Sequence, residues 1–188
     1  MIAFWGFILG LPIFAFGGAM LFSPPKARAF ADWFRESKAC AVLLSAVAWF
    51  WTAYECSTIG IDVFDAILLK DKTGGLLVWG LAAVLTYLVV VWMPRNLPVR
   101  ALSGILMLVP AELFKTTRLL LPESGFAPVH VFVATAYVGA VVGMYGMFYP
   151  WRVEKGVDMV LSRGWAARSL GALMAADGAA LAVIGLVV

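Results

Sequence analysis

Charge is what this sequence has least of. Only 13% of its 188 residues are Asp, Glu, Lys or Arg, about half of the roughly 25% that is usual in a soluble domain. Residues 1–25 contain none at all. So few charges cannot cover a water-soluble globule of this length. The hydrophobic fraction of 63% also excludes an intrinsically disordered chain.

Residues that carry out chemistry are scarce as well. The chain has one histidine and two cysteines, and Cys40 and Cys56 are expected near opposite ends of one helix, where they cannot form a disulfide with each other. It contains no HExxH, GxSxG, Walker A or glycine-rich dinucleotide motif, and no histidine pair for haem. We therefore expect a protein that is not an enzyme and has no cofactor or metal. The net charge of +3 is too small to indicate nucleic-acid binding.

Long apolar segments dominate what is present. A helix needs about 20 residues to cross a hydrocarbon core of about 30 Å. Four runs without acidic or basic residues and two less clean segments predict an all-α transmembrane bundle, with residues 1–188 forming a single integral membrane domain. The six spans are expected at about 2–22, 39–58, 74–93, 101–121, 128–149 and 168–188.

The basic residues are distributed unequally between the connections. Ten of the 14 Lys and Arg residues lie in the segments that join spans 1 to 2, 3 to 4 and 5 to 6. Short loops rich in Lys and Arg remain in the cytoplasm, so both termini are expected outside. Short loops and the lack of a targeting extension favour a prokaryotic cytoplasmic (inner) membrane.

The three basic connections resemble one another, which predicts three hairpins of related design. In each, a bulky residue is closely followed by a proline that ends the helix: Pro24, Pro94 and Pro150. Residues 27–37 and 153–161 mix apolar and charged side chains, as short helices in the membrane interface do. Residues 59–70 predict either a similar helix or a capped loop on the outer side. Alternatively, the resemblance reflects only the common use of proline and arginine at the inner boundary.

Asp177 is the sharpest candidate for a functional site. It lies inside the last span among small residues such as Gly171 and Gly178, which predict close packing against other helices. A charge in hydrocarbon costs at least ~2.5–3.5 kcal/mol. Asp177 is therefore either a proton- or cation-binding carboxylate or a polar anchor with hydrogen-bonding neighbours. Three side chains are expected at similar depth: Ser45, Thr86 and Tyr87.

Glu112 and Lys115 form the second candidate site. They are three residues apart in span 4 and can pair on one helix face. They either line a polar vestibule open to the outside or lie in a surface turn after a span that ends near residue 112, and we favour the turn. Glu55 and His130, at the outer ends of spans 2 and 5, can complete an outer polar cluster. A lone histidine at a helix start is, however, more often a hydrated interfacial residue.

Three hypotheses of function remain. A non-enzymatic accessory or scaffold membrane protein, with a membrane-protein partner or as a homo-oligomer in the lipid bilayer, agrees best with the missing motifs. A small transporter of a proton, ion or solute would use Asp177. A membrane enzyme acting on a lipid or quinone comes last, because no nucleophile or metal set is recognisable.

Overall fold

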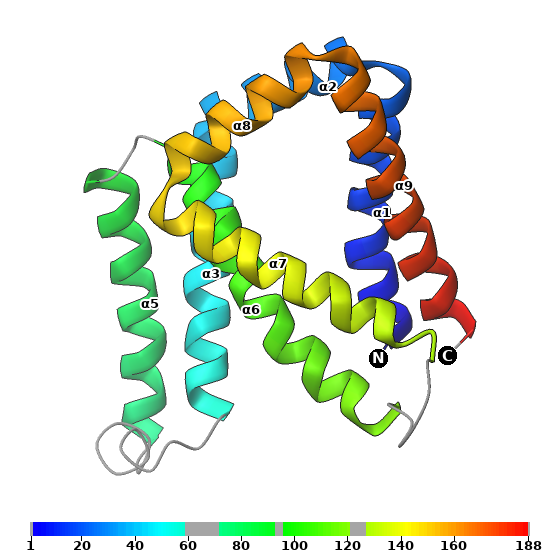
Figure 1. Cartoon of the computed structure of the whole chain (residues 1–188). Coiled ribbons are helices and arrows are strands. Elements are labelled where there is room, and N and C mark those ends of the chain that lie inside the picture. The colour runs from blue at the N-terminus through cyan, green and yellow to red at the C-terminus, as the bar shows by residue number, and fades with distance from the viewer. Residues whose placement is uncertain (1, 59–71, 93–95, 121–126, 188) are drawn as a thin grey trace.

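The computed structural model describes the chain apart from residues 1, 59–71, 93–95, 121–126 and 188 (Figure 1). The described residues form eight α-helices and one short 3-10 helix, η2, at Arg118–Leu120, which confirms the all-α fold. The α-helices are α1 (Ile2–Phe22), α2 (Pro24–Glu36), α3 (Lys38–Thr58), α5 (Lys72–Trp92), α6 (Leu97–Thr117), α7 (His130–Phe148), α8 (Pro150–Ser162) and α9 (Gly164–Val187).

Five helices are long and apolar enough to cross a membrane, namely α1, α3, α6, α7 and α9. They indicate a membrane-inserted protein. The remaining expected span corresponds to α5, whose described apolar stretch, Leu76–Trp92, is shorter. The described residues therefore support five of the six expected spans. The helix expected at residues 59–70 lies outside the described part of the chain.

Two of the expected spans were misplaced along the sequence. We expected helices to begin at residues 101 and 168, but α6 begins at Leu97 and α9 at Gly164, and α6 ends at Thr117. The expectation treated Arg100 and Arg168 as lying at or before the helix start. Both are inside their helices, where a long basic side chain can extend its charged end towards water.

The short helices α2 and α8 confirm that residues 27–37 and 153–161 contain helices separate from the spans. Each has 13 residues and starts with proline, which suits a first helical turn because its missing N–H is not needed there. The two regions have the same spacing along the chain. Adding 126 to the residue numbers of the end of α1, the two ends of α2 and the start of α3 gives the end of α7, the two ends of α8 and the start of α9. The connection from α5 to α6 is too short for such a helix, so only two of the three basic connections share this design.

The length of α2 and α8 determines how the long helices are arranged. A helix of 13 residues is about 20 Å long, so it separates the two helices that it joins. Figure 1 shows α2 and α8 together at one end of the molecule and both chain termini towards the other. The main packing pairs are α1 with α9, α6 with α7, and α3 with both α5 and α6. These are not the expected hairpin pairs. The connecting helices α2 and α8 hold α1 apart from α3 and α7 apart from α9, whereas α5 packs against α3 rather than against α6.

Glycines allow α1 and α9 to pack with their backbones in contact. A Cβ atom at Gly10 would lie 2.7 Å from the Gly178 carbonyl oxygen. A Cβ atom at Gly17 would lie 2.5 Å from the Ala175 amide nitrogen. No side chain fits at these distances, so only glycine permits the approach. This contact confirms the close packing expected for the last span and identifies α1 as its partner.

Two buried apolar clusters hold the long helices at their ends. The larger one gathers Leu113 of α6, Phe132 of α7 and Leu181 of α9 at the end far from α2 and α8. The smaller one joins Met20 of α1 to Ala167 of α9 at the corner where α2 and α8 meet them. From the larger cluster towards α2 and α8, α1 and α6 diverge (Figure 1).

Adjacent glycines in α1 test the importance of the close contact. Gly17→Ala should lower the free energy of unfolding by about 1–3 kcal/mol, because its Cβ meets the α9 backbone. Gly18→Ala is the control, since a Cβ there has no heavy atom within 4 Å. It should leave stability unchanged or raise it by up to ~1 kcal/mol through helix propensity. Thermal unfolding in detergent measures both, and equal melting temperatures would contradict this account of the contact.

Candidate functional site

Asp177 lies near the middle of α9 and hydrogen-bonds to α7. Its carboxylate accepts hydrogen bonds from the Thr135 hydroxyl, with Oγ1 at 3.0 Å from Oδ1 and 3.3 Å from Oδ2. Because α9 begins four residues earlier than expected, Asp177 is deeper in its helix than the sequence indicated. The contact joins two membrane-length helices.

The partners expected for Asp177 were wrong. Thr86 donates instead to the Ala82 carbonyl oxygen in its own helix, at 2.8 Å. Ser45 is buried, and its hydroxyl has no hydrogen-bond partner among the described residues. These residues belong to α3 and α5, whereas α9 packs against α1 and contacts α7. The expected depth of a side chain in the membrane does not identify which helices are neighbours. For that reason the sequence did not indicate Thr135 as the partner of Asp177.

Glu55, Glu112 and Lys115 come together as an ionic cluster between α3 and α6. The Lys115 Nζ lies 2.8 Å from Glu55 Oε2 and 2.9 Å from Glu112 Oε1. Glu55 is buried, with 5% of its surface exposed. The favoured surface turn was wrong, because α6 continues through this pair to Thr117.

An aromatic pair extends this cluster to α1. The Trp51 indole N–H donates to Glu55 Oε1 at 3.2 Å. The Trp51 ring also stacks on that of Trp5 from α1, with ring centroids 5.8 Å apart. The buried Glu55 carboxylate therefore receives a lysine and an indole donor, and the network connects three membrane-length helices.

His130 begins α7 and contacts its own turn. Its Nδ1 lies 3.0 Å from the Ala127 amide nitrogen and 2.8 Å from the Ala127 carbonyl oxygen. This local contact helps to define the start of α7. Glu55, Glu112 and Lys115 therefore lie together, whereas the contact described for His130 is a separate one.

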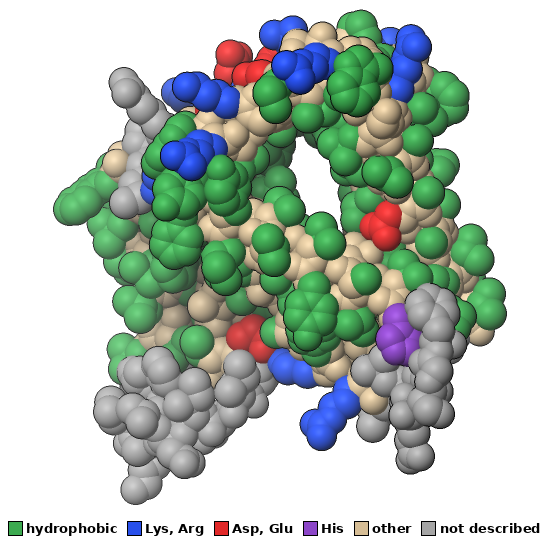
Figure 2. Space-filling model, viewed as in Figure 1, with side chains coloured by type: hydrophobic (Ala, Val, Ile, Leu, Met, Phe, Trp, Pro, Cys, Tyr) green, Lys and Arg blue, Asp and Glu red, His purple; other side chains and the backbone are tan. Residues whose placement is uncertain are grey.

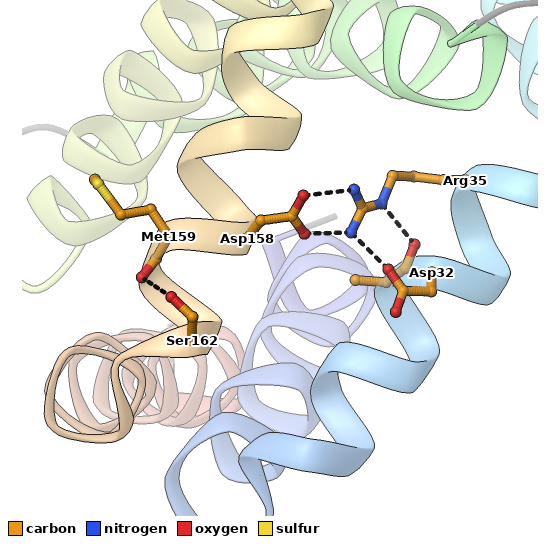
Figure 3. A network of polar contacts seen from close by, with 6 residues as sticks. Asp32, Arg35, Asp158, Met159 and Ser162 are labelled. Atoms are coloured by element: carbon orange, nitrogen blue, oxygen red, sulfur yellow. Dashed lines mark hydrogen bonds and ion pairs between the residues drawn. The ribbon is translucent and has the colours of Figure 1, made fainter.

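A pair of charges joins the short helices α2 and α8 (Figure 3). The Arg35 guanidinium donates to both Asp158 oxygens, at 2.7 and 3.2 Å, and to Asp32 at 2.8 Å. The hydrogen bond from Arg35 holds the pKa of Asp158 below its usual value, and the same contact raises the pKa of Arg35. Two parallel hydrogen bonds fix orientation as well as distance. Sequence reasoning missed this pair, although Asp32 and Asp158 occupy equivalent positions in the two short helices.

A cavity of about 710 Å³ lies between α1, α2, α6, α7 and α8. In Figure 2 this cavity is visible as an opening through the molecule. Side chains such as Ala15, Phe16 and Leu106 make its walls apolar. Three charged residues lie at the α2 and α8 side: Lys26, Arg35 and Glu154. Burial raises the pKa of Glu154 above its usual value.

Comparison with known proteins adds no assignment. No family model matches this chain, and neither a curated protein nor a solved structure matches it. Within the described ranges, no three His, Cys, Asp or Glu side chains are grouped so that they could hold a metal ion. The site must therefore be interpreted from its own geometry.

Replacing Lys115 tests whether the ionic cluster is structural. Lys115→Met should destabilise the fold by about 1–3 kcal/mol, because it leaves the buried Glu55 carboxylate without its cation. Adding Glu55→Gln should restore most of the loss. Arg118→Met is the matched control, at an exposed position just beyond α6. Denaturation in detergent distinguishes the outcomes, and no difference between Lys115→Met and the control would show that the cluster contributes little.

Proposed function

We propose that this protein is a non-enzymatic accessory subunit that binds another membrane protein through α5. The supporting observation is the position of α5, which packs substantially only against α3 among the described elements. Val78 and Ala82 are buried on the side that faces α3. Among the described elements, none packs substantially on the opposite side of α5, which is the side we assign to the partner.

The opposite face of α5 has features that suit helix association in lipid. Gly80, Val84 and Tyr87 share this face by helical spacing. A Cβ at Gly80 has no heavy atom within 4 Å, and Tyr87 is 67% exposed. Helices associate in membranes by close packing at small residues and by hydrogen bonds, since lipid removes the hydrophobic drive. A transmembrane helix of a different protein could contact Gly80 closely and hydrogen-bond to the Tyr87 hydroxyl.

The same proposal places the protein in a prokaryotic cytoplasmic membrane with both termini outside. Basic side chains gather around α2 and α8 in Figure 2. That distribution supports a cytoplasmic position for the short helices. The chain ends lie towards the opposite side of the molecule in Figure 1.

Site-specific photocrosslinking in native membranes tests the α5 partner. A photoreactive phenylalanine at Tyr87 should give one discrete protein adduct, identifiable by mass spectrometry, and Gly80→Leu should abolish it. The same probe at Leu173 of α9, which is also exposed, should give only lipid adducts. Gly18→Leu controls for the added bulk. Lipid adducts alone at Tyr87, or an adduct with a second, differently tagged copy of this chain, would overturn the proposal.

A small proton transporter is the second candidate, favoured by the Asp177–Thr135 contact. Thr135 is the single hydrogen-bond donor to Asp177 that the described residues provide. A carboxylate can accept about four hydrogen bonds. Asp177 would thus retain capacity to bind a proton within the membrane, where ionisable residues commonly serve transport.

Flux through proteoliposomes tests this second function. If Asp177 carries protons, Asp177→Asn should reduce proton flux to that of protein-free vesicles while its melting temperature stays close to wild type. Thr135→Val keeps the carboxylate and should retain flux. Transport would be excluded if wild-type flux equals that of protein-free vesicles, or if Asp177→Asn equals wild type.

A further inference from the structure

The cavity lies between membrane-length helices, where a lipid molecule can enter and occupy it. Its walls come from three membrane-length helices, α1, α6 and α7, and it is bounded at one end by α2 and α8. Its volume of about 710 Å³ falls within the usual range of roughly 300–1,000 Å³ for ligand sites. An unfilled space of this size would forfeit the dispersion contacts of all its lining atoms.

The walls favour an apolar chain over water. Ala15, Phe16 and Leu106 are joined in the lining by Leu102, Val142 and Val157. An apolar cavity does not hold water, because water needs two to four polar partners. The part of the occupant that lies among these side chains must therefore be hydrocarbon.

The charged residues at one end point to the polar part of the occupant. Arg35 is already committed to Asp158 and Asp32. Lys26 and Glu154 remain, one cationic and one carboxylic, both in the cavity lining. Lys26 suits a phosphate, and Glu154 suits a primary ammonium, which donates up to three hydrogen bonds. Burial raises the pKa of Glu154, and the charge of Arg35 acts in the opposite direction.

We infer that the cavity binds one zwitterionic phospholipid of the ethanolamine type. An acyl chain of this lipid lies between α1, α6 and α7, and its headgroup lies between Lys26 and Glu154. The apolar walls alone would accept any lipid chain. The opposed charges select a headgroup that has both a phosphate and a primary ammonium. The site is independent of the α5 face, so either proposal can fail without the other.

Native mass spectrometry of the full chain, released from mild detergent, tests this inference. The probes are phosphatidylethanolamine, phosphatidylcholine and phosphatidylglycerol with identical acyl chains. Wild type should retain one phosphatidylethanolamine under conditions that remove the other two. Ala15→Phe and, separately, Ala19→Phe fill the cavity and should abolish this retention. Ala83→Phe is the control, on the exposed surface of α5.

The headgroup contacts are tested by charge variants that leave the apolar walls intact. Glu154→Gln should weaken the preference for phosphatidylethanolamine over phosphatidylcholine by about fivefold, as expected for one lost hydrogen bond. Lys26→Gln should weaken retention of both lipids by a similar factor and leave the preference between them unchanged, because both carry the same phosphate. Lys38→Gln, outside the cavity lining, should change neither retention nor preference. Equal retention of the three lipids by wild type, or unchanged retention in a folded Ala15→Phe or Ala19→Phe protein, would overturn the inference.

Discussion

The arrangement of the long helices depends on two short ones. Because α2 and α8 are rigid and about 20 Å long, they separate the helices at their ends and leave them to pack with others. The Arg35–Asp158 pair then joins α2 to α8. If either short helix were a flexible loop, α1 could pack against α3 and α7 against α9, as in ordinary hairpins. The cavity is the space that this spacing creates.

Two carboxylates within the long helices make contacts between helices. Glu55 receives Lys115 from α6, and Asp177 receives Thr135 from α7. In hydrocarbon a polar group must find a partner inside the protein. Each such pair therefore determines which two helices become neighbours. Apolar side chains that face lipid do not impose this choice. The same contacts are compatible with a functional role for Asp177, since a carboxylate can be held in place and still bind a proton.

The sequence was informative where a property depends on local composition. Runs without charge located the long helices, and proline with mixed polarity located α2 and α8. The small residues around Asp177 correctly indicated close packing. Choosing α1 as the partner of α9 was beyond the sequence, because many apolar faces compete for such a partner. The Asp177–Thr135 contact and the cavity could not be predicted for the same reason, since both depend on which distant helices become neighbours.

The glycine contact between α1 and α9 has a consequence for biosynthesis. The segment that separates Phe22 at the end of α1 from Gly164 at the start of α9 contains 141 residues. At about 5–20 residues per second, a ribosome needs roughly 7–28 s to make it. Throughout that time the glycine face of α1 lies in the membrane without the helix that finally covers it. The insertion machinery or lipid must shield this face until α9 emerges, so the earliest described helix is among the last to reach its native packing.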